Sequence, residues 1–202
     1  MSATLFLIAI TCAASFVALN NPKMLEALIL WPPAVKRSNE YYRLVSYGLV
    51  HADFPHLLFN MITLYFFGRV MEDFYNSTMG QFGFVFFYTL GLLVSILPTY
   101  WKNRDNAQYR SLGASGAVSA VLFAFILFQP WTLIFIFFVP VPAILYAVLY
   151  VVYTIYSERR GGDNINHSAH LWGAAYGVLF TLVLEPRVAG VFLDGLMHPT
   201  LG

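Results

Sequence analysis

The chain has 202 residues, of which 59% are apolar and only 10% are charged. A soluble globular domain has roughly 45–50% apolar and about 25% charged residues, so this chain cannot cover a water-facing surface and needs lipid as much of its solvent. The net charge of +1 excludes a basic field for nucleic-acid binding, and the single cysteine, Cys12, excludes a disulfide scaffold and a cysteine-rich zinc site.

Runs without Asp, Glu, Lys or Arg indicate where the chain crosses the membrane, because a transmembrane helix needs about 20 mostly apolar residues. On this basis residues 1–202 are predicted to form one all-α membrane domain, a bundle of six transmembrane helices. The expected spans are residues 4–20, 56–75, 81–100, 114–128, 142–157 and 167–185. Since no basic residue precedes the first span, we expect a membrane anchor there and not a signal peptide.

The segments between these spans add two expectations. Gln129-Pro130 divides the charge-free run 111–157, which is too long for one helix. The polar segment 20–55 is expected to fold as an interfacial loop. Six spans also bring the starts of the second, fourth and sixth helices to one membrane face, and the polar residues of interest lie at those starts.

A candidate nucleophile opens the fourth helix in the sequence Gly113-Ala114-Ser115-Gly116. Its small neighbours leave the Ser115 hydroxyl accessible, and the free N–H groups at a helix start can stabilise an oxyanion. The alternative is a capping serine flanked by glycines that serve packing.

A candidate base, His170, opens the sixth helix. Small residues form ridges at four-residue spacing on the sixth and fourth helices: Ala169, Gly173 and Gly177, and Gly116, Ala120 and Ala124. Such ridges let two membrane helices approach closely, which would bring His170 toward Ser115. A neutral imidazole could then accept the hydroxyl proton. The alternative is an interfacial histidine that only bonds a loop.

Two hydrogen-bond donors, His56 and Asn60, lie four residues apart at the start of the second helix and therefore share a face. They could donate to an oxyanion, or they could hold helices together. A histidine metal site is only weakly indicated, because there is no His-Glu-x-x-His motif and His51 and His56 do not share a helical face. We therefore expect no metal and no cofactor.

A nucleophile, a base and two donors at one expected depth favour acyl transfer. Asp163, seven residues before His170, is interpreted as structural, so that a Ser–His dyad is favoured over a triad. A histidine-box oxygenase would need many clustered histidines, and the chain has five in total.

These motifs make the chain resemble the rhomboid intramembrane serine proteases over residues 41–178. The motifs are, in order, Tyr42-Arg43, His51 with His56 and Asn60, Gly68 with Glu72, Gly113-Ala114-Ser115-Gly116, and Ala169-His170 with Gly173 and Gly177. The resemblance implies a six-helix core in which Ser115 is the nucleophile and His170 the base. It implies an oxyanion hole formed by His56, Asn60 and the Ser115 backbone N–H. It also implies structural support from Arg43, His51, Glu72, Gly113, Gly116, Gly173 and Gly177.

The implied activity is an endopeptidase that works in the lipid bilayer and cleaves single-span or other transmembrane proteins in or next to their membrane segments. Two positions depart from the family pattern. Tyr42 replaces the usual Trp, and Ser119 stands where several members carry an aromatic residue that packs on the histidine, so packing on His170 must come from elsewhere. The alternative is a catalytically silent, rhomboid-like binding module; such relatives lack the serine or the histidine, and both are present here.

Charge and resemblance predict opposite membrane orientations. Loops on the expected Ser115 side carry nine basic residues: Lys23, Lys36, Arg37, Arg43, Lys102, Arg104, Arg110, Arg159 and Arg160. The other side carries Arg69 and Arg187, so the positive-inside rule puts the site in the cytoplasm. The resemblance implies a site that opens to the exoplasmic side of a bacterial inner membrane, with cytoplasmic termini. We follow the resemblance, because Arg43 belongs to one of its motifs.

The fifth expected helix is the candidate for lateral access of the substrate. Pro140 and Pro142 precede it, which weakens the backbone support of its first turn, and few small residues are available for close packing. We expect Leu145 and Leu149 to hold this helix against the bundle, so that trimming them to alanine eases access. The alternative is that they only face lipid.

Overall fold

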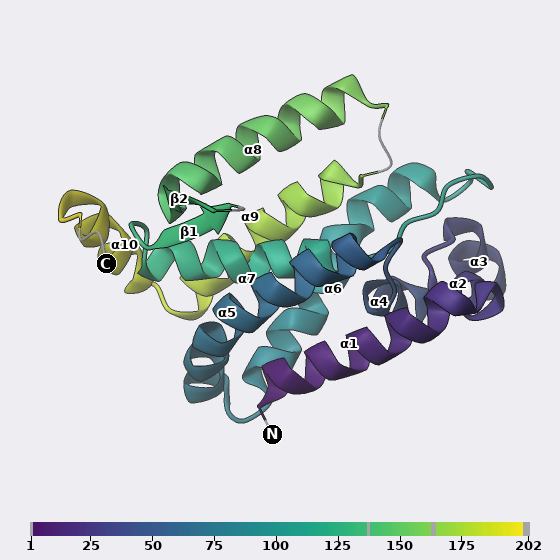
Figure 1. Cartoon of the computed structure of the whole chain (residues 1–202), viewed down its shortest axis with the longest axis horizontal. Coiled ribbons are helices and arrows are strands. Elements are labelled where there is room, and N and C mark those ends of the chain that lie inside the picture. The colour runs from purple at the N-terminus through teal and green to yellow at the C-terminus, as the bar shows by residue number, and fades with distance from the viewer. Residues whose placement is uncertain (1, 137, 163–164, 200–202) are drawn as a thin grey trace.

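The computed structural model describes residues 2–136, 138–162 and 165–199, and it is mostly helical (Figure 1). In these ranges the elements are α1 (Ala3–Asn20), α2 (Pro22–Leu28), α3 (Pro32–Ser38), α4 (Arg43–Ser46), the 3-10 turn η1 (Tyr47–Leu49), α5 (Phe54–Met79), α6 (Gly83–Asn103), α7 (Ser115–Phe128), β1 (Leu133–Ile136), β2 (Val139–Pro142), α8 (Ala143–Arg160), α9 (His167–Leu184) and α10 (Val188–Met197). Each of the six predicted spans corresponds to a helix that starts within two residues of the expected position: α1, α5, α6, α7, α8 and α9.

Two of these helices, α1 and α6, are each long and apolar enough to cross a membrane. Helices α9 and α10 are long and apolar enough to cross a membrane only when they are taken together, and the chain bends by 114° between them. Helix α7 is apolar but has 14 residues. By length and composition, the described residues therefore contain two or three candidate spans, and the count of six stays a prediction.

Helix α7 lies at the centre of the bundle. It packs against α5, α6 and α9, and Figure 1 shows it running between α5 and α9. Every residue from Gly116 to Leu127 is buried. A helix that is apolar on all sides suits this position, because protein surrounds it on most sides.

Helix α1 packs on α5 with its small and polar side chains inward. The buried residues recur every three or four positions: Thr4, Leu7, Thr11, Ser15 and Ala18. The exposed residues of the same helix include Leu5, Phe6, Ile10, Phe16 and Val17. Small residues allow close helix contact and large apolar ones suit lipid, so this distribution is the one expected of a helix at the lipid-facing edge of a bundle.

The polar segment between α1 and α5 is folded, and Arg43 holds it together. Its guanidinium is buried and donates to the Glu40 carboxylate at 2.6 Å and to the carbonyl oxygens of Glu26 and Ile29 at 2.7 and 2.8 Å. The hydrogen bond from Arg43 lowers the pKa of the Glu40 carboxyl. Tyr42, which replaces the usual Trp, has its ring 5.5 Å from the guanidinium carbon.

Between α7 and α8 the chain forms a β-hairpin that the sequence analysis did not predict. Strands β1 and β2 pair antiparallel, with Leu133 opposite Pro142 and Ile136 opposite Val139. The prolines of β2 lack an N–H group, and an edge strand tolerates them. The N–H groups of the next two residues, Ala143 and Ile144, donate to carbonyl oxygens of the connector at 2.9 and 2.8 Å. The expectation of weakened support for the first turn of α8 is therefore wrong.

The expected role of Leu145 and Leu149 in holding α8 is also wrong. These side chains are 49% and 55% exposed, whereas Ala143 and Ala147 on the same helix are buried. Helix α8 thus turns Ala143 and Ala147 toward the bundle and Leu145 and Leu149 outward. Trimming the two leucines removes little packing from the interface of α8 with the bundle.

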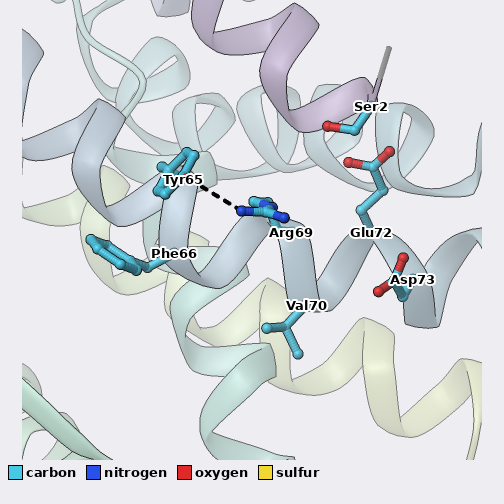
Figure 2. A pocket seen from close by; sticks show the side chains of 7 residues that line it. All are labelled: Ser2, Tyr65, Phe66, Arg69, Val70, Glu72 and Asp73. Carbon is cyan, nitrogen blue, oxygen red and sulfur yellow. Dashed lines mark hydrogen bonds between the residues drawn. The ribbon is translucent and has the colours of Figure 1, made fainter.

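Glu72 fastens α1 to α5. Its two carboxylate oxygens accept hydrogen bonds from the backbone N–H groups of Ala3 and Thr4 at 2.7 and 2.8 Å. These N–H groups lie in the first turn of α1, where a negative charge is favoured by the helix dipole. Figure 2 shows the Glu72 carboxylate close to Ser2, the N-cap residue of α1. One turn earlier, Gly68 leaves room for Thr4, since a Cβ at Gly68 would lie 3.1 Å from the Thr4 methyl group.

Replacing Glu72 by alanine should loosen α1 from the bundle. Loss of this charged acceptor is expected to cost about 1–3 kcal/mol in the free energy of unfolding, because it leaves two N–H groups without a partner. Helix α1 carries the partly buried Cys12, so faster labelling of its thiol by a maleimide reports on this helix directly.

The matched control is Asp73→Asn, which changes the neighbouring, exposed carboxylate of α5. Its labelling rate should equal that of the wild type. An unchanged rate in Glu72→Ala as well would contradict the fastening role.

Candidate active site

Ser115 is the first residue of α7, and the loop before it is held in place by two hydrogen bonds. The N–H of Gly113 donates to the carbonyl oxygen of Tyr47 at 2.9 Å, and the N–H of Ala114 donates to Nε2 of His51 at 3.3 Å. Gly113 has a φ of +109°, and a Cβ there would lie 2.6 Å from the His56 ring. Glycine is therefore required both by the turn and by the close approach of His56.

His170 lies in the first turn of α9, whose start is fixed by Asn166. The Asn166 side-chain oxygen accepts the N–H of Ala169 at 3.0 Å and the hydroxyl of Thr99 on α6 at 3.1 Å. Its amide nitrogen donates to the Ser111 hydroxyl at 3.2 Å. Asn166 is not among the predicted site residues, although an asparagine just before an apolar helical run is an N-cap signal that could have indicated it.

The two helix starts bring Ser115 and His170 together. Nε2 of His170 lies 2.7 Å from the hydroxyl oxygen of Ser115. With Nε2 unprotonated, the hydroxyl donates to it, which is the arrangement of a nucleophile beside its base. Both side chains line a pocket of about 850 Å³, and His56 and Asn60 line the same pocket.

This contact depends on the close approach of α7 and α9. A Cβ on Gly173 would collide with the carbonyl oxygen of Gly116, and a Cβ on Gly177 would collide with that of Ala120. On its other side, Gly116 faces the Ser95 hydroxyl of α6 at a separation that also leaves no room for a Cβ. The two ridges of small residues therefore face each other with the backbones in contact.

His51 lies next to the pocket and contacts both the loop before α7 and the ring of His56. It is fully buried, and its Nε2 accepts the Ala114 N–H, so the ring proton belongs on Nδ1, 3.0 Å from the Ser15 hydroxyl oxygen. Ser15 in turn donates to the carbonyl oxygen of Leu49 at 2.9 Å. Burial lowers the pKa of His51 to about 3, which keeps the ring neutral. The ring also meets the His56 ring edge-on, with centroids 4.9 Å apart.

His56 and Asn60 occupy the first two turns of α5. Asp53 caps this helix by accepting the His56 N–H at 2.7 Å. The Asn60 amide donates to the His56 carbonyl oxygen at 2.8 Å, a bond that uses one of its two N–H groups. Both side chains border the pocket that contains Ser115, where further N–H groups can reach a bound oxygen.

The remaining predicted site residues lie elsewhere. Arg43 and Glu72 support the segment after α1 and the α1–α5 contact, and Asp163 lies outside the described residues. Within the described ranges, no three His, Cys, Asp or Glu side chains are grouped so that they could hold a metal ion. A second pocket, of about 510 Å³, is lined by Ser2 and the second half of α5, and its lining includes no histidine (Figure 2).

Known proteins share this sequence pattern. Residues 38–187 match the model of the family described as "Rhomboid domain". In Arabidopsis thaliana, "RHOMBOID-like protein 12, mitochondrial" is 31% identical over 155 residues, which are 71% of this chain and 46% of that protein. "RHOMBOID-like protein 4" of the same plant is 35% identical over 165 residues, which are 76% of this chain and 37% of that protein.

A bacterial relative is matched over more of its length. The "Putative rhomboid protease YdcA" of Bacillus subtilis (strain 168) is 26% identical over 166 residues, which are 78% of this chain and 77% of that protein. The chain thus spans less than half of either Arabidopsis relative and about three quarters of the Bacillus one. Because the family match covers well over half of the chain, the protein belongs to the rhomboid family of membrane-embedded proteins.

Proposed function

We propose that this protein is an intramembrane serine endopeptidase, which hydrolyses a peptide bond in or next to a transmembrane segment of another protein. The observation that supports this best is the 2.7 Å separation of the Ser115 hydroxyl and His170 Nε2, in a pocket bordered by His56 and Asn60. Membership of the rhomboid family and the protease name of the Bacillus relative support the same class of reaction.

In the proposed acylation step, Ser115 Oγ attacks the carbonyl carbon of the scissile bond while its proton passes to Nε2 of His170. The carbonyl oxygen becomes an oxyanion, to which the Ser115 N–H and the side chains of His56 and Asn60 donate. When the C–N bond breaks, His170 returns the proton to the leaving amine. An ester between Ser115 and the new carboxyl end of the substrate remains.

In the deacylation step, water attacks that ester and His170 accepts a proton from the water. The C–O bond to Ser115 then breaks, and His170 returns the proton to the Ser115 oxygen. His51 takes no part in proton transfer in this scheme, because its pKa of about 3 keeps it neutral while it holds the Ala114 N–H and the His56 ring. In this scheme a Ser–His dyad carries the chemistry, as the sequence pattern favours.

We further propose that α1, α5, α6, α7, α8 and α9 all cross the membrane as one domain. The charges of α8 support this, because Glu158, Arg159 and Arg160 lie in its last turn. Helix α7 is short, but its burial between other helices means that few of its residues need to face lipid. In this topology the starts of α5, α7 and α9, which carry His56, Ser115 and His170, lie near one membrane face.

We propose that this face is exoplasmic, although more basic residues lie in its loops than on the other side. Several of these cations are paired within the folded loops: Arg43 with Glu40, Lys36 with Asp105, Arg110 with Glu26, and Lys102 with Glu158. The positive-inside rule counts Lys and Arg and predicts a cytoplasmic site, but because these cations lie in folded structure we give more weight to the family resemblance. A bacterial inner membrane is the proposed location on the resemblance; the Bacillus relative, which is matched over 77% of its length, supports only the bacterial part of this proposal.

The dyad predicts that Ser115→Ala and His170→Ala each abolish cleavage while the protein stays folded. The two side chains act as a unit, so the double variant should be no slower than either single one. The measurement is fragment formation from a panel of single-span proteins in proteoliposomes, with thermal unfolding as the check on the fold. The exposed serine variant Ser77→Ala, at the far end of α5, should cleave at the wild-type rate.

Cleavage by Ser115→Ala at the wild-type rate would contradict the proposed nucleophile. Substrate binding by both the wild type and Ser115→Ala, with cleavage by neither, would favour the binding-module alternative.

The oxyanion hole predicts that His56→Ala and Asn60→Ala reduce kcat more than they raise KM. Removal of one donor in a soluble protease costs on the order of 10²–10³ in kcat, and a similar loss is expected here. Thr63→Ala is the matched control, since this half-buried residue of α5 donates its hydroxyl to the backbone of its own helix and does not line the pocket. If both donor variants keep full kcat, His56 and Asn60 serve packing alone.

A further inference from the structure

A tyrosine from α8 packs on the His170 ring. The rings of Tyr150 and His170 are stacked, with centroids 6.1 Å apart and planes inclined by 26°. Aromatic rings interact at centroid distances of about 4.5–7 Å, so this is a direct contact. It matters because Ser119, one turn after the nucleophile, is too small to cover the imidazole.

Tyr150 is itself fixed by α7, the helix that carries the nucleophile. Its hydroxyl and the Ser119 hydroxyl are hydrogen-bonded at 2.6 Å. Its ring also contacts the ring of Phe123, with centroids 5.5 Å apart. Ser119 and Phe123 follow Ser115 by four and eight residues, so all three lie along one face of α7.

We propose that Tyr150 is the positioning residue for His170 and that Ser119 fixes Tyr150 for this task. The proposal rests on the proposed function of Ser115 and His170. An imidazole can turn about two side-chain torsions, and a flat ring against one of its faces restricts both. Since a base works only within a narrow range of distance and angle, a ring that limits this movement raises the fraction of productive encounters.

This arrangement makes the base depend on a helix that carries neither member of the dyad. Helix α8 lies at the edge of the bundle, away from α1 (Figure 1). A shift of α8 that separates Tyr150 from Ser119 would also withdraw the ring from His170. The packing of α8 against α7 thus controls how tightly the His170 ring is restricted to its position beside Ser115.

The test compares variants that remove the ring with variants that remove only the hydrogen bond. Tyr150→Leu should lower kcat about tenfold with little change in KM, the size expected for loss of one aromatic contact that acts on the transition state. Tyr150→Phe keeps the ring and should retain most of the activity. Labelling of Ser115 by a fluorophosphonate, which needs no substrate helix, should slow in parallel with kcat.

A double-mutant cycle tests the role of Ser119. Ser119→Ala and Tyr150→Phe remove the same hydrogen bond, so the double variant should be no slower than the slower single variant. The matched control is Tyr146→Leu, which removes a ring one turn earlier on α8 that contacts Tyr150 at 5.7 Å. This control should keep kcat close to the wild-type value.

Three outcomes would overturn the positioning role: a rise in KM alone, an equal loss of kcat in Tyr146→Leu, or an unchanged kcat in Tyr150→Leu. Tyr150→Met, whose unbranched side chain fills the space of the ring, takes the place of the leucine variant if thermal unfolding shows that the latter is not folded. Ser115→Ala is measured in parallel. Cleavage by that variant would refute the proposed function itself, whereas an inactive Ser115→Ala with a fully active Tyr150→Leu would refute the positioning role alone.

Discussion

The backbone contact between α7 and α9 is the constraint on which the rest of the site depends. Gly173 meets the Gly116 carbonyl and Gly177 meets that of Ala120, with no room for a Cβ at either glycine. Ser115 directly precedes the first contact on α7, and His170 lies one turn before it on α9. The distance between the two side chains is therefore set by main-chain atoms, which vary less than side-chain packing. Any larger residue at these glycines would separate Ser115 from His170.

A second, polar set of contacts fixes the other half of the site. His51 accepts the Ala114 N–H with one ring nitrogen and bonds Ser15 of α1 with the other, while its ring packs at a steep angle against that of His56. One neutral side chain thus connects the first helix, the loop before α5 and the loop before α7. A neutral ring suits a buried position, because burial disfavours the charged form of His51 more strongly than the nearby Asp53 favours it. The same contacts explain why Ser15 lies on the inward side of α1.

Features that depend on neighbouring residues could be predicted from the sequence, whereas contacts between distant segments could not. Charge-free runs bounded by charges and prolines located six helices, because length and polarity decide where an apolar helix can end. The β-hairpin was missed, since a short apolar run such as 133–142 fits strand or helix equally well. The error over Leu145 and Leu149 has a different source. A membrane helix can use small residues such as Ala143 and Ala147 for close contact while leucines face lipid, so bulk alone does not show which residues hold the helix.

The replacement of an aromatic residue by Ser119 shows why single positions could not reveal the surroundings of His170. Read on its own, Ser119 leaves the imidazole without a ring beside it, and Tyr150 is one bulky residue among several on α8. Only the packing of α8 against α7 joins the two, since the Ser119 hydroxyl bonds the tyrosine whose ring covers the base. A ring carried on α7 would move with the nucleophile, whereas a ring carried on α8 moves with a neighbouring helix. The ring on His170 is therefore carried by α8 and not by the helix of Ser115, so the contact depends on how α8 packs against α7.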